Sequence, residues 1–242
     1  MIIRSETVDV VTPTGAMRTY VYRPVEPGPW PGVVFFSEIF QQTGPIERTA
    51  RLVAGHGYVV AVPEVFHDLE PAGTVLAYDI EGAARGNQHK VTRPIEAFDD
   101  DARAVVTWLQ TAAGCTGSVG ALGVCLGGHL AFRCAMDPRV RVAACLYATD
   151  IHQGSLGKAG DDSLARIPQI RGELLMIWGR QDPHIPDAGR ALVQQHLVAA
   201  GTKFTWHELD AQHAFLRDEG PRYDPTLALL CYRLILDLFR RL

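Results

Sequence analysis

The chain lacks the features of secreted, membrane-spanning and nucleic-acid-binding proteins. Its first residues, MIIRSETVDV, contain no basic start followed by a long apolar segment, so we expect no signal peptide. No apolar run reaches the roughly 18 residues that a membrane-spanning helix needs. The formal net charge is −4 and no basic patch stands out, which argues against nucleic acid as a partner. These absences predict a soluble protein that binds neither membrane nor nucleic acid.

Cysteine is scarce and irregularly spaced, with five residues: Cys115, Cys125, Cys134, Cys145 and Cys231. The count is odd and no two cysteines have CxxC spacing, which argues against a disulfide framework and a structural zinc site. We therefore expect reduced thiols, a cytoplasmic location and no metal site. A cysteine in such a protein is usually a small buried apolar residue, and we expect this of Cys134, Cys145 and Cys231.

The chain also lacks repeats, low-complexity blocks and a linker rich in Pro, Gly and Ser, so we predict one domain over residues 1–242. Apolar runs of strand length alternate with segments of helical period. Strands are predicted at 16–24, 31–39, 58–66, 118–124, 140–148, 172–179 and 203–210, and helices at 47–58, 94–112, 126–136, 186–201 and 224–242. This alternation predicts an α/β fold with a mainly parallel sheet, helices on both faces and 16–24 at an edge. Sites in such sheets form at the carboxyl ends of the strands.

One cysteine occupies an unusual local sequence, Gly123-Val124-Cys125-Leu126-Gly127, between a predicted strand and a predicted helix. This is the pattern of a nucleophile elbow, in which glycines on both sides allow a sharp turn. The turn places Cys125 at a helix N-terminus, where N–H groups and the helix dipole stabilise a thiolate. The N–H of Leu126 can then face an oxyanion. The alternative is a tight turn around a buried, inert thiol.

Two further residues follow predicted strands in the order that this fold requires, nucleophile, acid and histidine. Asp182 lies in the loop after 172–179, and His213 lies after 203–210. An imidazole can accept the thiol proton and later protonate a leaving group, while a carboxylate fixes its tautomer. We therefore predict Cys125, Asp182 and His213 as a catalytic triad. The alternatives are a solvated or helix-capping Asp182 and a loop histidine bonded to the backbone.

These segments resemble the dienelactone hydrolase (carboxymethylenebutenolidase) family of α/β-hydrolases. The resemblance covers nearly the whole chain and rests on four motifs: FFSEIF (35–40), GVCLGG (123–128), GRQDPHIP (179–186) and QHAFLR (212–217). It implies a single-domain α/β-hydrolase fold, cleavage of a small ester or lactone substrate through a thioester, and no cofactor. Monomer and dimer remain open.

The resemblance also implies roles for several further residues. Glu38 matches a glutamate that helps to deprotonate the thiol, and a carboxylate at a buried strand end is costly unless paired. The N–H of Ile39 would be the second oxyanion donor beside that of Leu126. Arg217 matches an arginine that holds a substrate carboxylate, for which a guanidinium fork is well suited. The alternatives are a Glu38 paired with a nearby arginine and an Arg217 on the surface.

The resemblance also implies a second substrate-binding cation, which we expect in EGAARGNQHKVTR (81–93). The composition of the overlapping segment LAYDIEGAARGNQHK (76–90) suggests a mobile lid. Arg85 is our choice, with Lys90 and Arg93 as alternatives, and Tyr147 after a buried strand is expected to line the pocket. Two other functions remain open at this point. One is an acyltransferase or thioesterase that uses the same cysteine, and the other is a non-catalytic binding protein, which would not need Asp182 and His213.

Overall fold

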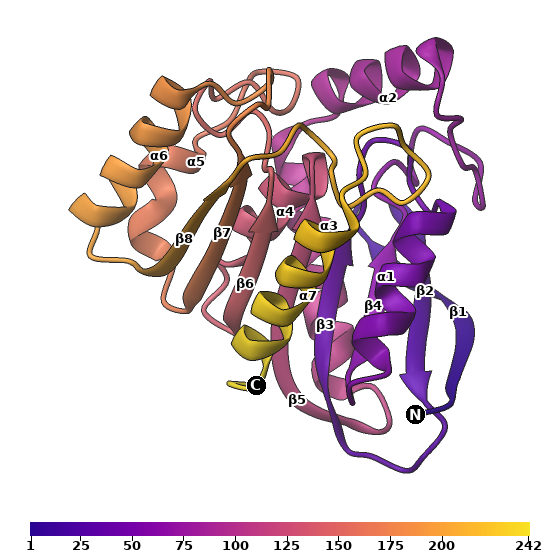
Figure 1. Ribbon diagram of the computed structural model, residues 1–242. Coiled ribbons are helices and arrows are strands. Elements are labelled where there is room, and N and C mark those ends of the chain that lie inside the picture. Colours follow the sequence, from indigo (N-terminus) through magenta and orange to yellow (C-terminus); the bar gives the residue numbers. More distant parts are fainter.

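Eight strands form one mainly parallel sheet in the computed structural model, which describes residues 1–242 (Figure 1). The strands are β1 (Ile3–Thr12), β2 (Gly15–Pro24), β3 (Trp30–Phe36), β4 (Val59–Pro63), β5 (Cys115–Val124), β6 (Val140–Leu146), β7 (Glu173–Gly179) and β8 (Lys203–Leu209). Their order across the sheet is β1-β2-β4-β3-β5-β6-β7-β8. Strands β3 to β8 run parallel, and β1 and β2 run antiparallel to their neighbours. This confirms the predicted α/β fold.

Burial along the strands explains their sequences. Every residue of β4 and β7 is buried, as expected for central strands covered on both faces, and both are nearly continuous apolar runs. Strand β8 lies at an edge of the sheet and alternates between exposed and partly buried residues. The alternation of its side chains follows from having only one covered face.

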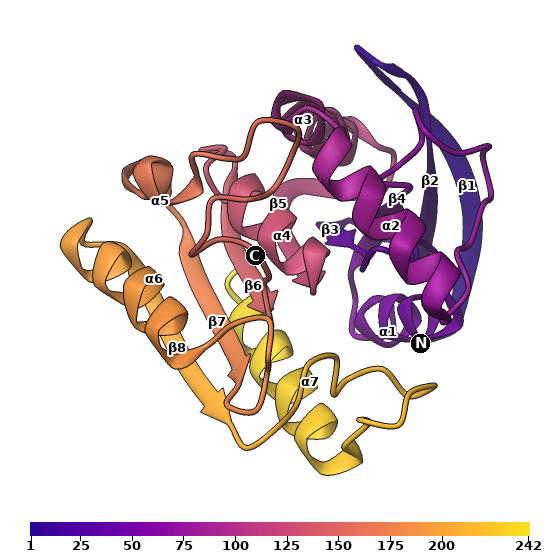
Figure 2. The same cartoon turned by 90° about the horizontal axis from the view of Figure 1, so that it is seen from above.

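Helices cover both faces of this sheet. They are α1 (Gly44–Ala54), α2 (Ile80–Thr92), α3 (Ile95–Thr111), α4 (Leu126–Cys134), α5 (Ser163–Arg166), α6 (Asp187–Ala199) and α7 (Pro225–Phe239), with a 3-10 turn at Ile167–Gln169. Helices α1 and α7 pack on one face, and α3 and α4 pack on the other (Figure 2). Helix α2 does not join either layer, but lies across the carboxyl edge of the sheet (Figure 1). No helix is long and apolar enough to span a membrane.

Two elements differ from the sequence prediction. The edge strand is β1, and β2, which was predicted to be the edge strand, lies between β1 and β4. Six of the ten residues of β1 are exposed, so the strand carries little apolar pattern to detect. The segment 76–90, expected to be a lid loop, contains most of α2, which Asp79 caps by accepting a hydrogen bond from the Gly82 N–H. Only Gly82 and Gly86 of α2 are buried, so no apolar stripe announces the helix.

The chain changes direction across the sheet between β3 and β5. These two strands are neighbours, and the chain continues from β3 to β4 on one side and from β5 to β6 on the other. The loops that leave β3 and β5 therefore border a crevice at the carboxyl edge, which is the usual ligand site in open α/β sheets. Seen from above, helix α2 crosses this edge of the sheet beside β3, on the side of β4 and α1 (Figure 2).

Candidate active site

Cys125 stands at the turn between β5 and α4 with φ 58° and ψ −123°, a backbone conformation that few residues with a side chain adopt. A Cβ atom at Gly123 would overlap the Gly127 carbonyl oxygen, and one at Gly127 would overlap the Phe36 carbonyl oxygen. Both glycines are therefore required, and the turn has the predicted form of a nucleophile elbow. Cys125 is partly exposed to a cavity of about 580 Å³.

Backbone strain is concentrated around this cavity. Five residues other than glycine have positive φ: Gln41, Cys125, Tyr147, Asp150 and Ala214. Three of them, Cys125, Asp150 and Ala214, line the cavity, and all five lie in loops at the carboxyl ends of strands. Such conformations cost on the order of 1–3 kcal/mol each, and they cluster where a structure must aim particular groups at a ligand.

His213 and Asp182 meet directly, because the loops after β7 and β8 are joined by backbone hydrogen bonds such as Gln181 N–H to Ala211 O (2.9 Å). His213 Nδ1 lies 2.6 Å from Asp182 Oδ2, and Asp182 Oδ1 accepts the His184 N–H at 2.9 Å. Both side chains are almost fully buried. The carboxylate thus fixes the imidazole and leaves Nε2 for another partner.

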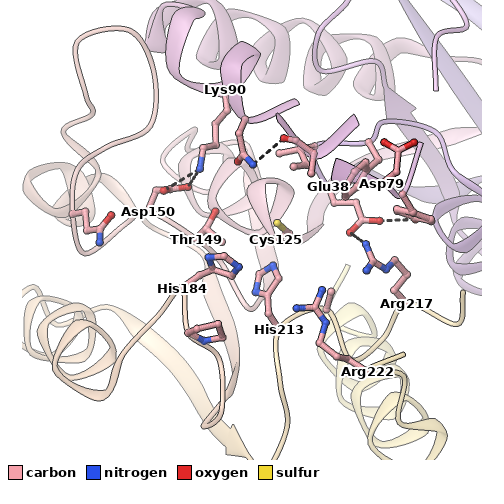
Figure 3. Close-up of a pocket in the computed structure, with 18 of the residues that line it drawn as sticks. Glu38, Asp79, Lys90, Cys125, Thr149, Asp150, His184, His213, Arg217 and Arg222 are labelled. Atoms are coloured by element: carbon pink, nitrogen blue, oxygen red, sulfur yellow. Dashed lines mark hydrogen bonds and ion pairs between the residues drawn. The ribbon is translucent and has the colours of Figure 1, made fainter. Parts of the chain in front are cut away.

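The other partner of His213 is the Cys125 sulfur, toward which the ring points (Figure 3). Burial by itself disfavours an imidazolium and lowers its pKa. The charge of the Cys125 sulfur and the hydrogen bond to Asp182 outweigh this effect and raise the pKa of His213 to about 10. The order of contacts is therefore sulfur, imidazole and carboxylate.

Two backbone N–H groups near Cys125 have no acceptor within the protein. They belong to Ile39, in the loop after β3, and to Leu126, the first residue of α4. The close approach of Gly127 to the Phe36 carbonyl brings the start of α4 against the end of β3, so these loops lie side by side. Unpaired N–H groups at such a position can hold an anion.

Glu38 lies next to Ile39 in the loop after β3. Its carboxylate is buried and contacts Tyr78 and Arg217. The Tyr78 hydroxyl donates to Glu38 Oε1 at 2.6 Å, and Arg217 Nη1 lies 3.7 Å from Oε2. Burial raises the pKa of Glu38, while the Tyr78 hydrogen bond and Arg217 oppose this shift. The guanidinium of Arg217 also stacks on the Tyr78 ring, 4.3 Å from its centroid. Sequence reasoning missed Tyr78, although the segment containing it was recognised.

The three cations considered for the second substrate contact differ in their position relative to the cavity. Arg85 is bound to Glu70, with Nη2 2.6 Å from Oε2, and is not part of the cavity wall. Arg93 has no exposed surface and is held by Asp68 and Asp101. Only Lys90 lines the cavity, where Nζ lies 2.9 Å from Asp150 Oδ2. The choice of Arg85 relied on its sequence position, which does not reveal that it turns away from the cavity toward a buried carboxylate.

Tyr147 lies behind the cavity and not in its main wall. Its ring packs edge to face against two other rings. The centroid of Tyr147 lies 5.2 Å from that of His213 and 5.4 Å from that of Phe215. The side chain is buried, and burial raises the pKa of its hydroxyl well above the usual value. Tyr147 therefore supports the position of the imidazole.

Arg222 lines the cavity and was not considered from the sequence. It is half-buried, beside His213 and Arg217 (Figure 3), and no carboxylate of the protein pairs with it. His184 lines the same wall, its ring centroid 4.7 Å from that of His213. Burial lowers the pKa of His184 and the neighbouring His213 lowers it further. Arg222 follows a proline in a long loop, and no local pattern indicates where its side chain points.

No group of three or more His, Cys, Asp or Glu side chains is placed to hold a metal ion. All five cysteines are free, and Cys134, Cys145 and Cys231 are buried, as predicted.

Comparisons with known proteins find relatives of this chain. A sequence model of the dienelactone hydrolase family matches residues 17–242. A protein of Saccharomyces cerevisiae, provisionally named carboxymethylenebutenolidase, is 39% identical over 254 residues, which span 100% of this chain and 93% of the relative. The carboxymethylenebutenolidase of Pseudomonas putida is 27% identical over 212 residues, 86% of this chain and 85% of its own.

Solved structures show the same fold. A Klebsiella pneumoniae protein described as a candidate dienelactone hydrolase superposes with a TM-score of 0.88 at 23% identity over 100% of both chains. A dienelactone hydrolase-like promiscuous phosphotriesterase from metagenomic libraries superposes with a TM-score of 0.78 at 20% identity, covering 100% of this chain and 99% of its own. The fold and the sequence matches together show that the chain belongs to the dienelactone hydrolase family, as a hydrolase of ester or lactone bonds.

Proposed function

We propose that the protein cleaves a small anionic ester or lactone through Cys125, His213 and Asp182, with a thioester intermediate. The observation that carries this proposal is the 2.6 Å contact of Asp182 and His213 beside a cysteine held at the elbow, facing a cavity large enough for a small ligand. The relatives' name, carboxymethylenebutenolidase, denotes an enzyme whose substrate is a lactone that carries a carboxylate. That chemistry fits a cavity with an unpaired arginine.

In the first half of the reaction, the Cys125 thiol gives its proton to His213 and its sulfur attacks the acyl carbon. The carbonyl π electrons move to oxygen, where the N–H groups of Ile39 and Leu126 hold the negative charge. The tetrahedral intermediate collapses and breaks the bond to the ester oxygen. This oxygen takes the proton from His213, which leaves a neutral imidazole and a thioester on Cys125.

In the second half, water attacks the thioester while His213 accepts one of its protons. Collapse of this intermediate breaks the C–S bond, and the sulfur recovers the proton from His213. The balance is one ester and one water converted to one acid and one alcohol, or to one hydroxy acid if the substrate is a lactone. Asp182 keeps the imidazole in one tautomer and stabilises its charged form in both halves.

Glu38 assists the deprotonation of the thiol in this scheme. Its carboxylate lines the same cavity as Cys125, and burial raises its pKa. A raised pKa makes the carboxylate a stronger base than an exposed glutamate. The Tyr78 hydrogen bond and Arg217 oppose this rise in the pKa of Glu38.

The anionic part of the substrate binds to the arginine side of the cavity. Arg217 is already opposed by Glu38, whereas Arg222 has no carboxylate partner and stands next to His213 (Figure 3). On the other side, the charge of Lys90 is matched by Asp150. We therefore assign Arg222 as the main electrostatic contact for a substrate carboxylate, with Arg217 as its neighbour.

The triad is tested by trapping the acyl group. Rapid acid quench of the protein with an ester, followed by peptide mass spectrometry, is expected to find the acyl mass on the peptide containing Cys125. Cys125→Ala should lose turnover by at least about 10³-fold, because no other nucleophile is placed at the elbow. Cys115→Ala, which changes a partly exposed cysteine outside the cavity, is the control and should retain activity.

Turnover by Cys125→Ala, or an acyl group on another residue, would disprove the mechanism. Adding an amine or alcohol acceptor in the same assay separates hydrolysis from acyl transfer. Hydrolysis predicts free acid as the main product even with acceptor present.

The anion contact is tested with an anionic ester and a neutral ester of equal size. Arg222→Ala should raise KM for the anionic ester about tenfold or more, since a charged hydrogen bond contributes roughly 1.5–3 kcal/mol. KM for the neutral ester should change little. Arg85→Ala is the matched control, because its guanidinium is bound to Glu70 outside the cavity, and it should leave both values unchanged. Equal effects of Arg222→Ala on the two esters would remove the carboxylate assignment.

A further inference from the structure

Helix α2 touches the loop after β3 at a glycine. A Cβ atom at Gly86 would lie 2.6 Å from the Ile39 carbonyl oxygen and 2.9 Å from the Ile39 Cβ. A Cβ atom does not come this close to non-bonded heavy atoms, so an alanine at this position would force the helix and the loop apart. Gly86 is buried, and it is the residue through which the helix backbone lies directly against Ile39.

The contact matters because Ile39 carries one of the two unpaired N–H groups above the cavity. The same loop has two further contacts with the segment that precedes α2. The Leu76 N–H donates to the Phe40 carbonyl at 3.2 Å, and Gln41 Nε2 donates to the Thr74 carbonyl at 2.9 Å. The Ile39 peptide therefore lies between the end of β3 and a scaffold made by residues 74–86.

The last part of α2 is held separately from this contact. The Lys90 carbonyl accepts a hydrogen bond from the Gly157 N–H at 3.1 Å. Earlier in the helix, Arg85 and His89 bind Glu70 through side chains that can follow a shifted backbone. Gly82, the other buried residue of α2, faces Ala77 in the helix's own leading segment. An outward movement of the middle of α2 would therefore separate Gly86 from the Ile39 peptide, while the end of the helix at Lys90 stays held.

We propose that Gly86 is a positioning residue, whose lack of a side chain lets α2 fix the Ile39 N–H at the place where the oxyanion forms. This rests on the proposed function, in which Ile39 and Leu126 hold that oxyanion. Oxyanion donors act only within about 2.7–3.1 Å of the developing charge, and a misplacement of about 1 Å can cost on the order of 100-fold in rate. The helix that covers the cavity is therefore also a part of the catalytic geometry.

The test is Gly86→Ala, assayed for kcat, KM, melting temperature and two inhibitors. An aldehyde analogue of the substrate reports oxyanion stabilisation, because its adduct with Cys125 is tetrahedral, whereas the product acid binds without such an adduct. We expect kcat and aldehyde affinity to fall together by about tenfold or more, with product-acid affinity nearly unchanged. The melting temperature should fall only slightly, because alanine favours a helix over glycine by roughly 0.5–1 kcal/mol, which offsets part of the cost of the displaced contact.

Ala84→Gly is the matched control. Ala84 is exposed on the same helix, so this change weakens the helix without altering the contact with Ile39. It should leave kcat and aldehyde affinity unchanged, whereas equal losses in both variants would show that only helix stability matters. Unchanged kcat in Gly86→Ala, or a variant that does not fold, would assign Gly86 to packing. Either result would leave the acyl-trapping experiment on Cys125 intact, so the inference can fail without the proposed function failing.

Discussion

Among single residues, His213 shows how neighbours overcome burial. An isolated imidazole that is buried loses its proton more easily, but the Cys125 sulfur and Asp182 hold the charged form. Asp182 is in turn fixed by the His184 N–H, so the carboxylate does not rotate away. The Cys125, His213 and Asp182 side chains are thus mutually dependent, and a change in one alters the titration of another.

We expect Cys125→Ala to lower the pKa of His213 from about 10 toward its ordinary value, because the sulfur is the first of the causes that raise it. The imidazolium would then lose its proton at lower pH than in the parent protein. Titration of the imidazole nitrogen signals by NMR measures this shift directly. An unchanged pKa in the variant would show that the sulfur and the ring do not interact.

Among the elements, the turn from β5 to α4 carries the most stringent steric condition. Gly123 and Gly127 face backbone atoms, which cannot move aside as a flexible side chain could. Helix α2 has only two buried residues, Gly82 and Gly86, and Gly86 lies against Ile39. Steric constraint in the elbow therefore comes from backbone atoms at two glycines, whereas the contact of α2 with the loop after β3 has one such position.

Gly123→Ala should lower the free energy of unfolding by more than about 4 kcal/mol, or prevent folding, because the new methyl group overlaps the Gly127 carbonyl. Gly201→Ala is a suitable control. Gly201 has φ 65° but no atoms within 4 Å of its missing Cβ, so only backbone strain of about 1 kcal/mol is expected. Urea denaturation of both variants measures the difference. Similar losses in the two would mean that the elbow is not sterically constrained.

Across the entire fold, a buried ionic cluster joins the end of α2 to the loop after β4 and to α3. Arg93, directly after α2, pairs with Asp68 in the loop after β4 and with Asp101 in α3. His67 also contacts Asp101, with Nε2 3.2 Å from Oδ1. The end of α2, the loop after β4 and helix α3 are thus joined at one guanidinium. Such clusters fix geometry more than they add stability.

Arg93→Met should cost about 3–5 kcal/mol of unfolding free energy, since it leaves the buried Asp101 carboxylate without its guanidinium. Arg103→Met removes an exposed ion pair on the same α3 helix and should cost about 0–1 kcal/mol. Urea unfolding at neutral pH compares the two. A cost for Arg93→Met no greater than for Arg103→Met would show that the cluster contributes nothing to holding these segments together.

The sequence alone predicted the fold class and the residues that meet at the sheet edge. Strands buried on both faces appear as continuous apolar runs, and residues directly after them must lie at one edge when the strands are parallel. This is why Cys125, Asp182 and His213 could be named without coordinates. The same logic failed for β1, which is largely exposed, and for α2, which has no apolar stripe.

Only the tertiary structure decided which charges enter the cavity. Arg85 lies on α2, which has no apolar stripe, and Arg222 lies in the long loop before α7. At neither position does the local sequence determine where the side chain points. Arg85 binds the buried Glu70 carboxylate and so points away from the cavity. The loop before α7 places Arg222 in the cavity wall together with His213. The position of a residue at a strand end is fixed by local backbone geometry, which a few neighbouring residues encode. The direction of a charged side chain on a loop depends on its burial and on partners far away in the sequence, and therefore on the whole chain.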